Sequence, residues 1–194
     1  VYQQASVERP AARLADPDNR LLWRMPRQRL EVEAMRDAML AVGGELDHRM
    51  GGRPFELLSD PITPRRTVYA FVNRDVVSPF MSTFDAANPN ACTAKRPDTT
   101  VPQQALFALN SNFIQDRAAA MAKLAAAKSD SDDKTDAEMV MALYRRAFAR
   151  EPSQDELEAA LAFVESKEVK MDKAHRWQQF AHALLAANEF VFLD

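Results

Sequence analysis

Glycine is scarce in this chain. Only four occur among 194 residues, in two adjacent pairs, Gly43–Gly44 and Gly51–Gly52. Folds built only from strands need many tight turns, and glycine is the residue that such turns use most. Residues that favour helices, such as Ala, Leu, Met, Glu, Gln and Arg, are abundant instead, so we expect a mainly α-helical fold.

Cysteine, excess positive charge and long apolar runs are also lacking. The single Cys92 excludes an internal disulfide, and we expect a buried or inert thiol there. With 25 basic and 28 acidic residues the net charge is −3, and no basic stripe is visible, so we expect no nucleic-acid partner. No apolar run approaches the roughly 20 residues of a membrane span. The chain begins at Val1 without a signal-peptide pattern, and we expect a piece of a longer protein truncated at its N-terminus.

The usual catalytic motifs are missing. There is no glycine-rich phosphate loop, no G-x-S-x-G and no H-E-x-x-H, and without C-x-x-C-H the chain attaches no c-type haem. His175 and His182 are seven apart, whereas two zinc ligands on one helix usually stand four apart. The acidic loop at 130–133 lacks the glycine and distal glutamate of an EF-hand, and the oxygen-rich 85–90 segment is explained by turn formation. We therefore expect neither a metal nor a cofactor in this chain.

The first half of the chain is predicted to mix helices with long loops. Asp16-Pro17 has the form of a helix start, and a helix is predicted over 26–42 that ends at a left-handed Gly43. The 43–66 stretch holds all the glycines and several prolines, so we expect a long irregular connection. Residues 66–73 are rich in β-branched and aromatic side chains, which predicts a strand, with 80–84 as its partner in one short two-stranded sheet.

The second half is predicted to be helical. The pattern Thr100-Val-Pro-Gln103 predicts a capped helix over 101–127, broken near 110–112 by three poor helix formers. An acidic linker is expected at 129–134. The pairs Thr135/Glu138 and Ser153/Glu156 predict two further caps. The apolar stripes predict a C-terminal three-helix unit over 135–194. We expect this unit to pack on a helical domain formed by residues 1–128, whose irregular middle at 43–100 is rich in arginine.

One polar cluster lies on the helix predicted over 26–42. Arg29, Glu33 and either Arg36 or Asp37 are spaced so that they share a helix face. They fit three interpretations: a surface ladder of ion pairs, a buried ionic network that fixes the irregular 43–66 loop, or a site with a catalytic carboxylate.

An ordered series of motifs runs through nearly the whole chain. They are Asp16-Pro-Asp-Asn-Arg20-Leu-Leu-Trp-Arg24, Arg29-Leu-Glu-x-Glu-Ala-x-Arg36-Asp37, Arg65-Arg66-x-Val-Tyr69-x-Phe71, Phe84-Asp85, Cys92-x-x-x-Arg96, Thr100-Val-Pro-Gln-Gln-Ala-Leu-Phe107, Leu143-Tyr-Arg145 and Leu184-Leu-x-x-Asn188-Glu189-Phe190. In this order they resemble the C-terminal domain of planctomycete cytochrome-c-type proteins, the domain of unknown function number fifteen fifty-three. The last sixty or so residues are also similar, more loosely, to small helical repeats of bacterial surface proteins.

This resemblance implies a setting rather than a reaction. Proteins of the family are large, exported polypeptides that often carry an N-terminal c-type haem domain, so the resemblance implies an extracytoplasmic location, on the cell surface or in the periplasm. The partners that it implies are the upstream domains of the same protein, the haem domain among them, or another protein or a glycan. No activity is established for the domain, so no catalytic residue is carried over.

Three functional hypotheses remain open at this stage. The first is a non-catalytic structural or interaction module, whose apolar N-terminal residues Tyr2 and Val7 would pack on the chain or form an exposed interface. The second is a glycan- or polymer-acting enzyme domain with a site in the 36–110 region. The third is an electron-transfer surface for a haem domain. The enzyme's candidate polar residues are Arg36, Asp37, Arg65, Arg66, Arg74, Asp85, Arg96 and Asn110. If they converge in an open pocket the enzyme hypothesis gains, and if they bind one another and backbone carbonyls the module hypothesis gains.

Overall fold

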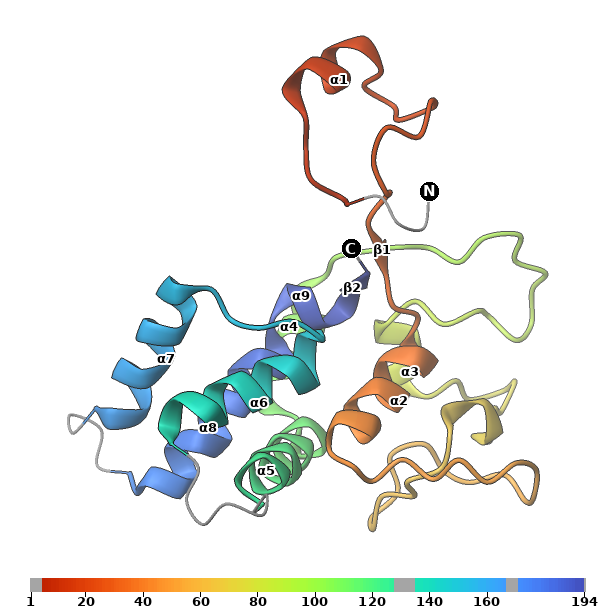
Figure 1. Ribbon diagram of the computed structural model, residues 1–194. Coiled ribbons are helices and arrows are strands. Elements are labelled where there is room, and N and C mark those ends of the chain that lie inside the picture. The colour runs from red at the N-terminus through yellow and green to blue at the C-terminus, as the bar shows by residue number, and fades with distance from the viewer. Residues whose placement is uncertain (1–4, 128–134, 167–170, 194) are drawn as a thin grey trace.

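The computed structural model of the chain describes residues 5–127, 135–166 and 171–193. It is mainly α-helical with one short antiparallel sheet, which confirms the predicted fold class (Figure 1). The elements, in chain order, are α1 (Pro10–Ala15), β1 (Gln28–Arg29), α2 (Val32–Val42), the 3-10 helix η1 (Thr67–Tyr69), α3 (Pro79–Thr83), α4 (Pro102–Asn110), α5 (Asn112–Ala126), α6 (Asp136–Phe148), α7 (Gln154–Glu165), α8 (Lys173–Ala186), α9 (Asn188–Val191) and β2 (Phe192–Leu193).

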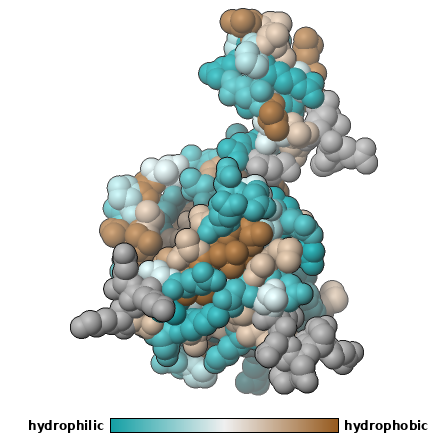
Figure 2. Space-filling model, turned by 60° about the vertical axis from the view of Figure 1, so that its left-hand side comes forward, coloured by the Kyte–Doolittle hydropathy of each residue, from teal (hydrophilic) through white to brown (hydrophobic). Residues whose placement is uncertain are grey.

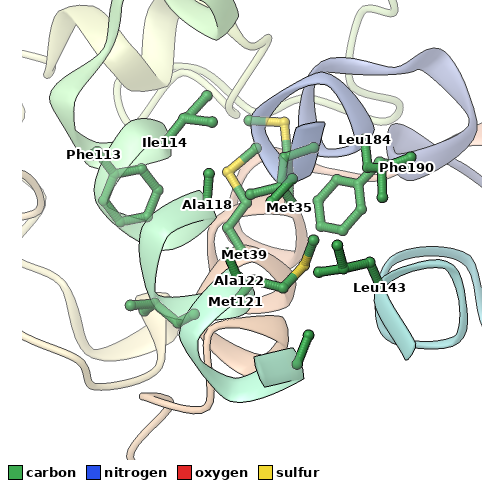
Figure 3. Packing of buried hydrophobic residues seen from close by; sticks show 14 of the residues in the cluster. Met35, Met39, Phe113, Ile114, Ala118, Met121, Ala122, Leu143, Leu184 and Phe190 are labelled. Atoms are coloured by element: carbon green, nitrogen blue, oxygen red, sulfur yellow. The ribbon is translucent and has the colours of Figure 1, made fainter. Parts of the chain in front are cut away.

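The core is centred on the contact between α5 and α8, which lie side by side with α2 and α6 against them (Figure 1). Ala118 on α5 and Ala181 on α8 are both fully buried, and such small side chains let two helices approach closely. Leu143 from α6 and Met39 from α2 fill the space on either side (Figure 3). Each large side chain buried in this way contributes roughly 2–5 kcal/mol relative to alanine.

The C-terminal helices begin where their caps predict. The Thr135 hydroxyl accepts from Glu138 N at 3.3 Å, and the Glu138 carboxylate accepts from Thr135 N at 2.8 Å. Ser153 and Glu156 form the same reciprocal pair at the start of α7. The boundary drawn between 1–128 and 135–194 stays a prediction, and the linker at 129–134 with its acidic loop at 130–133 lies outside the described residues.

The segment predicted as a helix over 101–127 with a break near 110–112 forms two helices, α4 and α5, as expected. The N-terminal cap of α4, however, lies one residue later than predicted. Val101, not Thr100, is the N-cap residue, and the side chain that reaches back to its N–H, at 3.5 Å, is Gln104. The reason is Pro102. It occupies the first helical position, where its fixed φ suits the helix and its missing N–H costs nothing, so the cap is the residue before it.

The predicted strand at 66–73 and its partner at 80–84 are wrong. Thr67–Tyr69 form a 3-10 turn, and Pro79–Thr83 form α3. Asp37 accepts a hydrogen bond from Thr67 N, which removes a donor that a strand ladder would need. The sheet that does form is β1 with β2, where Gln28 pairs with Leu193, and Leu30 N donates to Val191 O at 2.7 Å next to it.

Two predicted helix starts near the N-terminus also differ from the structure. Asp16 does not start a helix but follows the last residue of α1, and its carboxylate accepts from Arg20 N and Leu21 N at 3.0 and 2.7 Å, which closes a loop. The helix predicted from residue 26 begins only at Val32, because residues 28–29 are taken up by the sheet.

The left-handed residue after α2 is Gly44 with φ of 72°, not Gly43 with φ of −72°. The chain turns one residue late because Gly43 N still bonds to Met39 O, as in a further residue of helix.

Residues 5–27 form an N-terminal arm that stands away from the helical body (Figures 1 and 2). Its helix α1 has no buried residue, and the arm is held by its own hydrogen bonds, such as Trp23 Nε1 to Asp16 O at 2.9 Å. Val7 is 68% exposed and therefore does not pack on the chain, while Tyr2 lies outside the described residues. No helix within the described residues is long and apolar enough to cross a membrane.

Candidate functional site

Arg36 is the most deeply buried of the candidate polar residues. It lies on the inner face of α2, and its side chain has no exposed surface. The guanidinium donates to Thr63 O at 2.7 Å, to Arg65 O at 3.1 Å and to the Thr67 hydroxyl at 3.2 Å. A charge removed from water must find such partners, and here they are backbone carbonyls of the irregular loop. Arg36 therefore fixes the end of that loop against α2.

Two aromatic rings complete the surroundings of Arg36. Its guanidinium carbon lies 5.4 Å from the centroid of Phe55 and 5.6 Å from that of Phe113, within cation–π range. Burial lowers the pKa of Arg36 to about 10, which still leaves the side chain charged at neutral pH. The residue is thus a charged packing element rather than a group that exchanges protons.

Asp37 is committed to the same loop. One of its oxygens accepts from both Thr67 N and the Thr67 hydroxyl, at 2.7 and 2.6 Å. Arg66 reaches the other oxygen only at 3.9 Å and is half exposed. The carboxylate therefore binds a threonine of its own fold and faces an arginine, and its side chain is only 18% exposed.

Arg65 binds the preceding part of the loop. Its guanidinium donates to the carbonyls of Gly51 and Arg53, the latter at 2.8 Å, and lies 4.9 Å from the centroid of the Tyr69 ring. With it, four of the candidate residues, Arg36, Asp37, Arg65 and Arg66, come together around η1. Of the three interpretations of the cluster, the contacts of Arg36 and Asp37 correspond to the buried network that fixes the 43–66 loop.

Asp85 belongs to a second group. Its carboxylate binds Arg29 Nη2 at 2.5 Å and accepts from Thr99 N and the Thr99 hydroxyl at 2.9 and 2.8 Å. Burial alone would raise the pKa of Asp85, but the hydrogen bonds from Thr99 and Arg29 outweigh it and hold that pKa below its usual value. This group ties the strand β1 to both ends of the 85–99 loop.

Arg96 ties the same loop to α2. Its two terminal nitrogens bind the two oxygens of Glu33 at 2.6 and 3.1 Å, and Glu31 lies 3.4 Å away. Burial would raise the pKa of Glu33, yet the contacts with Arg96 lower it. The ladder along one helix face, which was one of the three interpretations, does not form, because Glu33 pairs with Arg96 and Arg29 pairs with Asp85.

Arg74 and Asn110 are not part of either group. The Asn110 side chain donates to Leu106 O at 2.9 Å, at the end of α4. The carbonyl of Arg74 accepts from Asn90 at 2.7 Å, in the exposed turn that contains Asn88 and Asn90. Thus the eight candidates are spread over several places and converge in no single pocket.

The cysteine and the histidines make no further site. Cys92 is exposed, so the thiol is not buried, and of the two expectations for it an inert thiol stays a prediction. His182 is buried with Nε2 2.7 Å from Ala108 O, and His175 lies 3.3 Å from Gln179 on its own helix. Across residues 5–127, 135–166 and 171–193, no three His, Cys, Asp or Glu side chains gather in a way that could hold a metal ion.

The candidates predicted from the sequence did not include the two threonines that bind Asp37 and Asp85. Thr67 donates to the Asp37 carboxylate and Thr99 to that of Asp85, yet a threonine outside regular structure carries no sequence pattern that marks it. A cavity of about 250 Å³ beneath the sheet was also missed, since it is made by residues from α2, α4, α5, α8 and α9 that are far apart in the chain.

Comparison with known proteins supports the resemblance drawn from the motifs. No curated protein and no solved structure matches the chain. The profile of one family matches residues 1–164, which includes every element from α1 to most of α7 and leaves α8 and α9 beyond it. The chain therefore belongs to the PSD1 family, described as a protein of unknown function (DUF1553).

Proposed function

We propose that this chain is a non-catalytic interaction module of a larger, extracytoplasmic, multi-domain protein, and that the N-terminal arm is its docking element. The observation that carries the proposal is that the arm buries a charged side chain and exposes apolar ones. Asp16 is 8% exposed at the centre of the arm, while Leu14 and Leu21 are 86% and 83% exposed on its outside. Exposed apolar side chains on an element that projects from the body are available to form an interface.

The charge of the arm indicates the kind of surface that it fits. Between residues 5 and 27 there are five arginines, and the three acidic residues are Glu8, Asp16 and Asp18, which leaves a net charge of +2 (5 − 3). A partner face with an apolar centre and an acidic rim would complement it. We place that face on another domain of the same polypeptide, and a c-type haem domain is the one that the family resemblance suggests.

The polar clusters support the non-catalytic part of the proposal. General acid catalysis near neutral pH needs a carboxyl group with a raised pKa. The carboxylates with displaced pKa values, Glu33, Asp47, Asp85 and Glu156, are all displaced downward by hydrogen bonds from their neighbours. None of these four carboxylates therefore has the raised pKa that a glycan- or polymer-acting enzyme needs in its general acid.

A binding experiment tests the docking role. The chain and the remaining domains of its full-length protein are produced separately and mixed in a calorimeter. We expect saturable binding that weakens at least tenfold when Leu14 and Leu21 are replaced by Asp. The matched control is Met50→Asp/Val76→Asp, which adds the same two charges at apolar residues of the body that are 84% and 70% exposed, and it should leave the affinity unchanged.

Two results would overturn the proposal. One is an affinity that Leu14→Asp/Leu21→Asp and Met50→Asp/Val76→Asp alter equally. The other is a glycan-cleaving activity of the chain that disappears in Asp37→Asn or Asp85→Asn while circular dichroism shows the fold intact, which would establish the enzyme alternative instead.

A further inference from the structure

The cavity of about 250 Å³ has an apolar floor. Met35 and Met39 from α2, Ile114 from α5 and Leu185 from α8 line it, and each is at most 3% exposed. Figure 3 shows the two methionine side chains pointing into the space between α5 and the end of α8. Ligand sites in proteins are mostly apolar pockets with a few polar groups, so such a floor favours an apolar guest.

The wall of the cavity favours an aromatic guest. Phe84 lines it and belongs to an aromatic cluster, with its ring 5.1 Å from Phe80 and 5.5 Å from Phe107 between centroids. A ring that enters the cavity extends this cluster, and offset or edge-to-face aromatic contacts are favourable. The thioethers of Met35 and Met39 add sulfur–aromatic contacts and adapt their shape to the guest.

The mouth of the cavity favours a guest without charge. Arg29 stands there, but Asp85 at 2.5 Å and Asp98 at 3.3 Å already neutralise it. The Gln104 amide is also engaged, because it donates to Thr83 O and Thr99 O at 2.9 and 3.1 Å.

Two further polar groups at the mouth are available. Thr100 and Asn188 are exposed and line the cavity, and their side chains hydrogen-bond to no other residue of the described part of the chain. A hydroxyl or N–H group at the outer end of a guest can bind them without the cost of separating an ion pair.

Taken together, the geometry points to a binding site for a small uncharged aromatic molecule of the phenol or indole class, and we propose that this is a ligand site of the domain. A cavity of about 150 Å³ is sufficient for benzene, so this one has room for a ring system of about eight to ten heavy atoms. Its apolar part lies on Met35, Met39 and Phe84, and its polar group faces Thr100 and Asn188. The site does not depend on the docking role of the arm.

Indole is the probe that tests this site. The full chain is labelled with ¹³C at the methionine methyl groups and titrated with indole while methyl NMR spectra are recorded. We expect saturable shifts of Met35 and Met39, with a dissociation constant on the order of 0.1–1 mM, as small ligands of this size reach. Met121 is buried on α5 but does not line the cavity, and its methyl signal should stay in place.

Variants of α4 show whether the shifts come from the cavity. Ala105 is exposed and lines the mouth, so Ala105→Leu partly fills the entrance without disturbing the core and should weaken binding at least tenfold. Ala108→Leu fills the cavity from deeper in the wall and should do the same if the variant folds. Gln103→Leu adds a leucine on the same helix outside the lining and should bind indole as the wild type does.

Absence of saturable shifts at Met35 and Met39 would overturn the proposal. So would shifts of equal size at Met121, or an indole affinity that Ala105→Leu and Gln103→Leu alter to the same extent.

Discussion

Asp37 and Thr67 are joined by two hydrogen bonds, from the backbone N–H and from the hydroxyl of the threonine, at 2.7 and 2.6 Å to one carboxylate oxygen. The same hydroxyl accepts from Arg36 at 3.2 Å. Thr67 is only 2% exposed, so a single buried hydroxyl connects two adjacent charged residues of α2 to the far end of the irregular loop.

Replacement of that hydroxyl should therefore be costly. Thr67→Val keeps the shape but removes a donor to Asp37 and an acceptor for Arg36, and we expect a loss of about 1–3 kcal/mol in the free energy of unfolding. Thr67→Ser keeps the hydroxyl and should lose less than about 1 kcal/mol. Urea denaturation measures both. Equal losses for the two variants would mean that the methyl group, not the hydroxyl, matters at this position.

Arg36 and Arg66 both neighbour Asp37 but should differ greatly in importance. Arg36→Met leaves Thr63 O, Arg65 O and the Thr67 hydroxyl without their donor, and we expect a loss of at least about 3 kcal/mol. Arg66 is half exposed and 3.9 Å from the carboxylate, so Arg66→Met should cost no more than about 1 kcal/mol. Thermal unfolding of both variants measures the difference. Equal unfolding temperatures for Arg36→Met and Arg66→Met would contradict this ranking.

The two glycines after α2 offer a further matched pair. A Cβ on Gly44 would lie 2.5 Å from Leu124 Cδ1, and its φ of 72° is unfavourable for alanine, so Gly44→Ala should lose about 1–3 kcal/mol. At Gly43 the closest atom is the flexible end of Glu45 at 3.2 Å, and φ is −72°. Gly43→Ala should change the free energy of unfolding by no more than about 1 kcal/mol in either direction. A larger loss at Gly43 than at Gly44 in chemical denaturation would contradict the assignment of the left-handed residue.

Phe190 on α9 should be essential although it lies beyond the part of the chain that the family profile matches. It is 6% exposed and packs in the core (Figure 3), so Phe190→Ala should lose about 3–5 kcal/mol. Leu193 in β2 is 50% exposed, and Leu193→Ala should lose less than about 1 kcal/mol. Guanidinium denaturation distinguishes them. A mild effect of Phe190→Ala would show that α9 contributes little to the core.

Glu156 should make the stability depend on pH in acid. Hydrogen bonds from Arg150, both at 2.8 Å, and from Ser153 N at 2.7 Å lower the pKa of Glu156 from 4.5 to about 2. Since the folded value is the lower one, the stabilisation is fully present above pH 4.5 and is lost as the pH falls towards 2. The difference in stability between wild type and Glu156→Gln should shrink over that range. Urea denaturation at successive pH values measures it, and a constant difference between pH 5 and 2 would contradict the assignment.

Much of the helical structure could be read from the chain because its signals are local. Thr135 with Glu138 and Ser153 with Glu156 lie three residues apart, and each pair fixes a helix start without help from the rest of the fold. The break between α4 and α5 is equally local, since it lies at Asn110–Asn112, where three poor helix formers meet. The family was also recognisable, because ordered motifs survive in the sequence whatever their contacts are.

The polar clusters could not be read in the same way. Arg29 binds Asp85, which is 56 residues away in the sequence, and Arg96 binds Glu33, which is 63 residues away. Helical spacing had suggested that Arg29 and Glu33 would pair with each other. The segment around Thr67 has the composition of a strand, yet the carboxylate of Asp37 holds it in a 3-10 turn.

The sequence by itself therefore determined the helical class, the caps of the C-terminal helices and the family. Only the tertiary structure decided which arginine binds which carboxylate, that β1 pairs with β2, and that a cavity forms beneath that sheet. The physical reason is the distance along the sequence over which each interaction acts. Caps and apolar stripes act over three or four residues, whereas a buried charge takes whatever partner the folded chain brings to it.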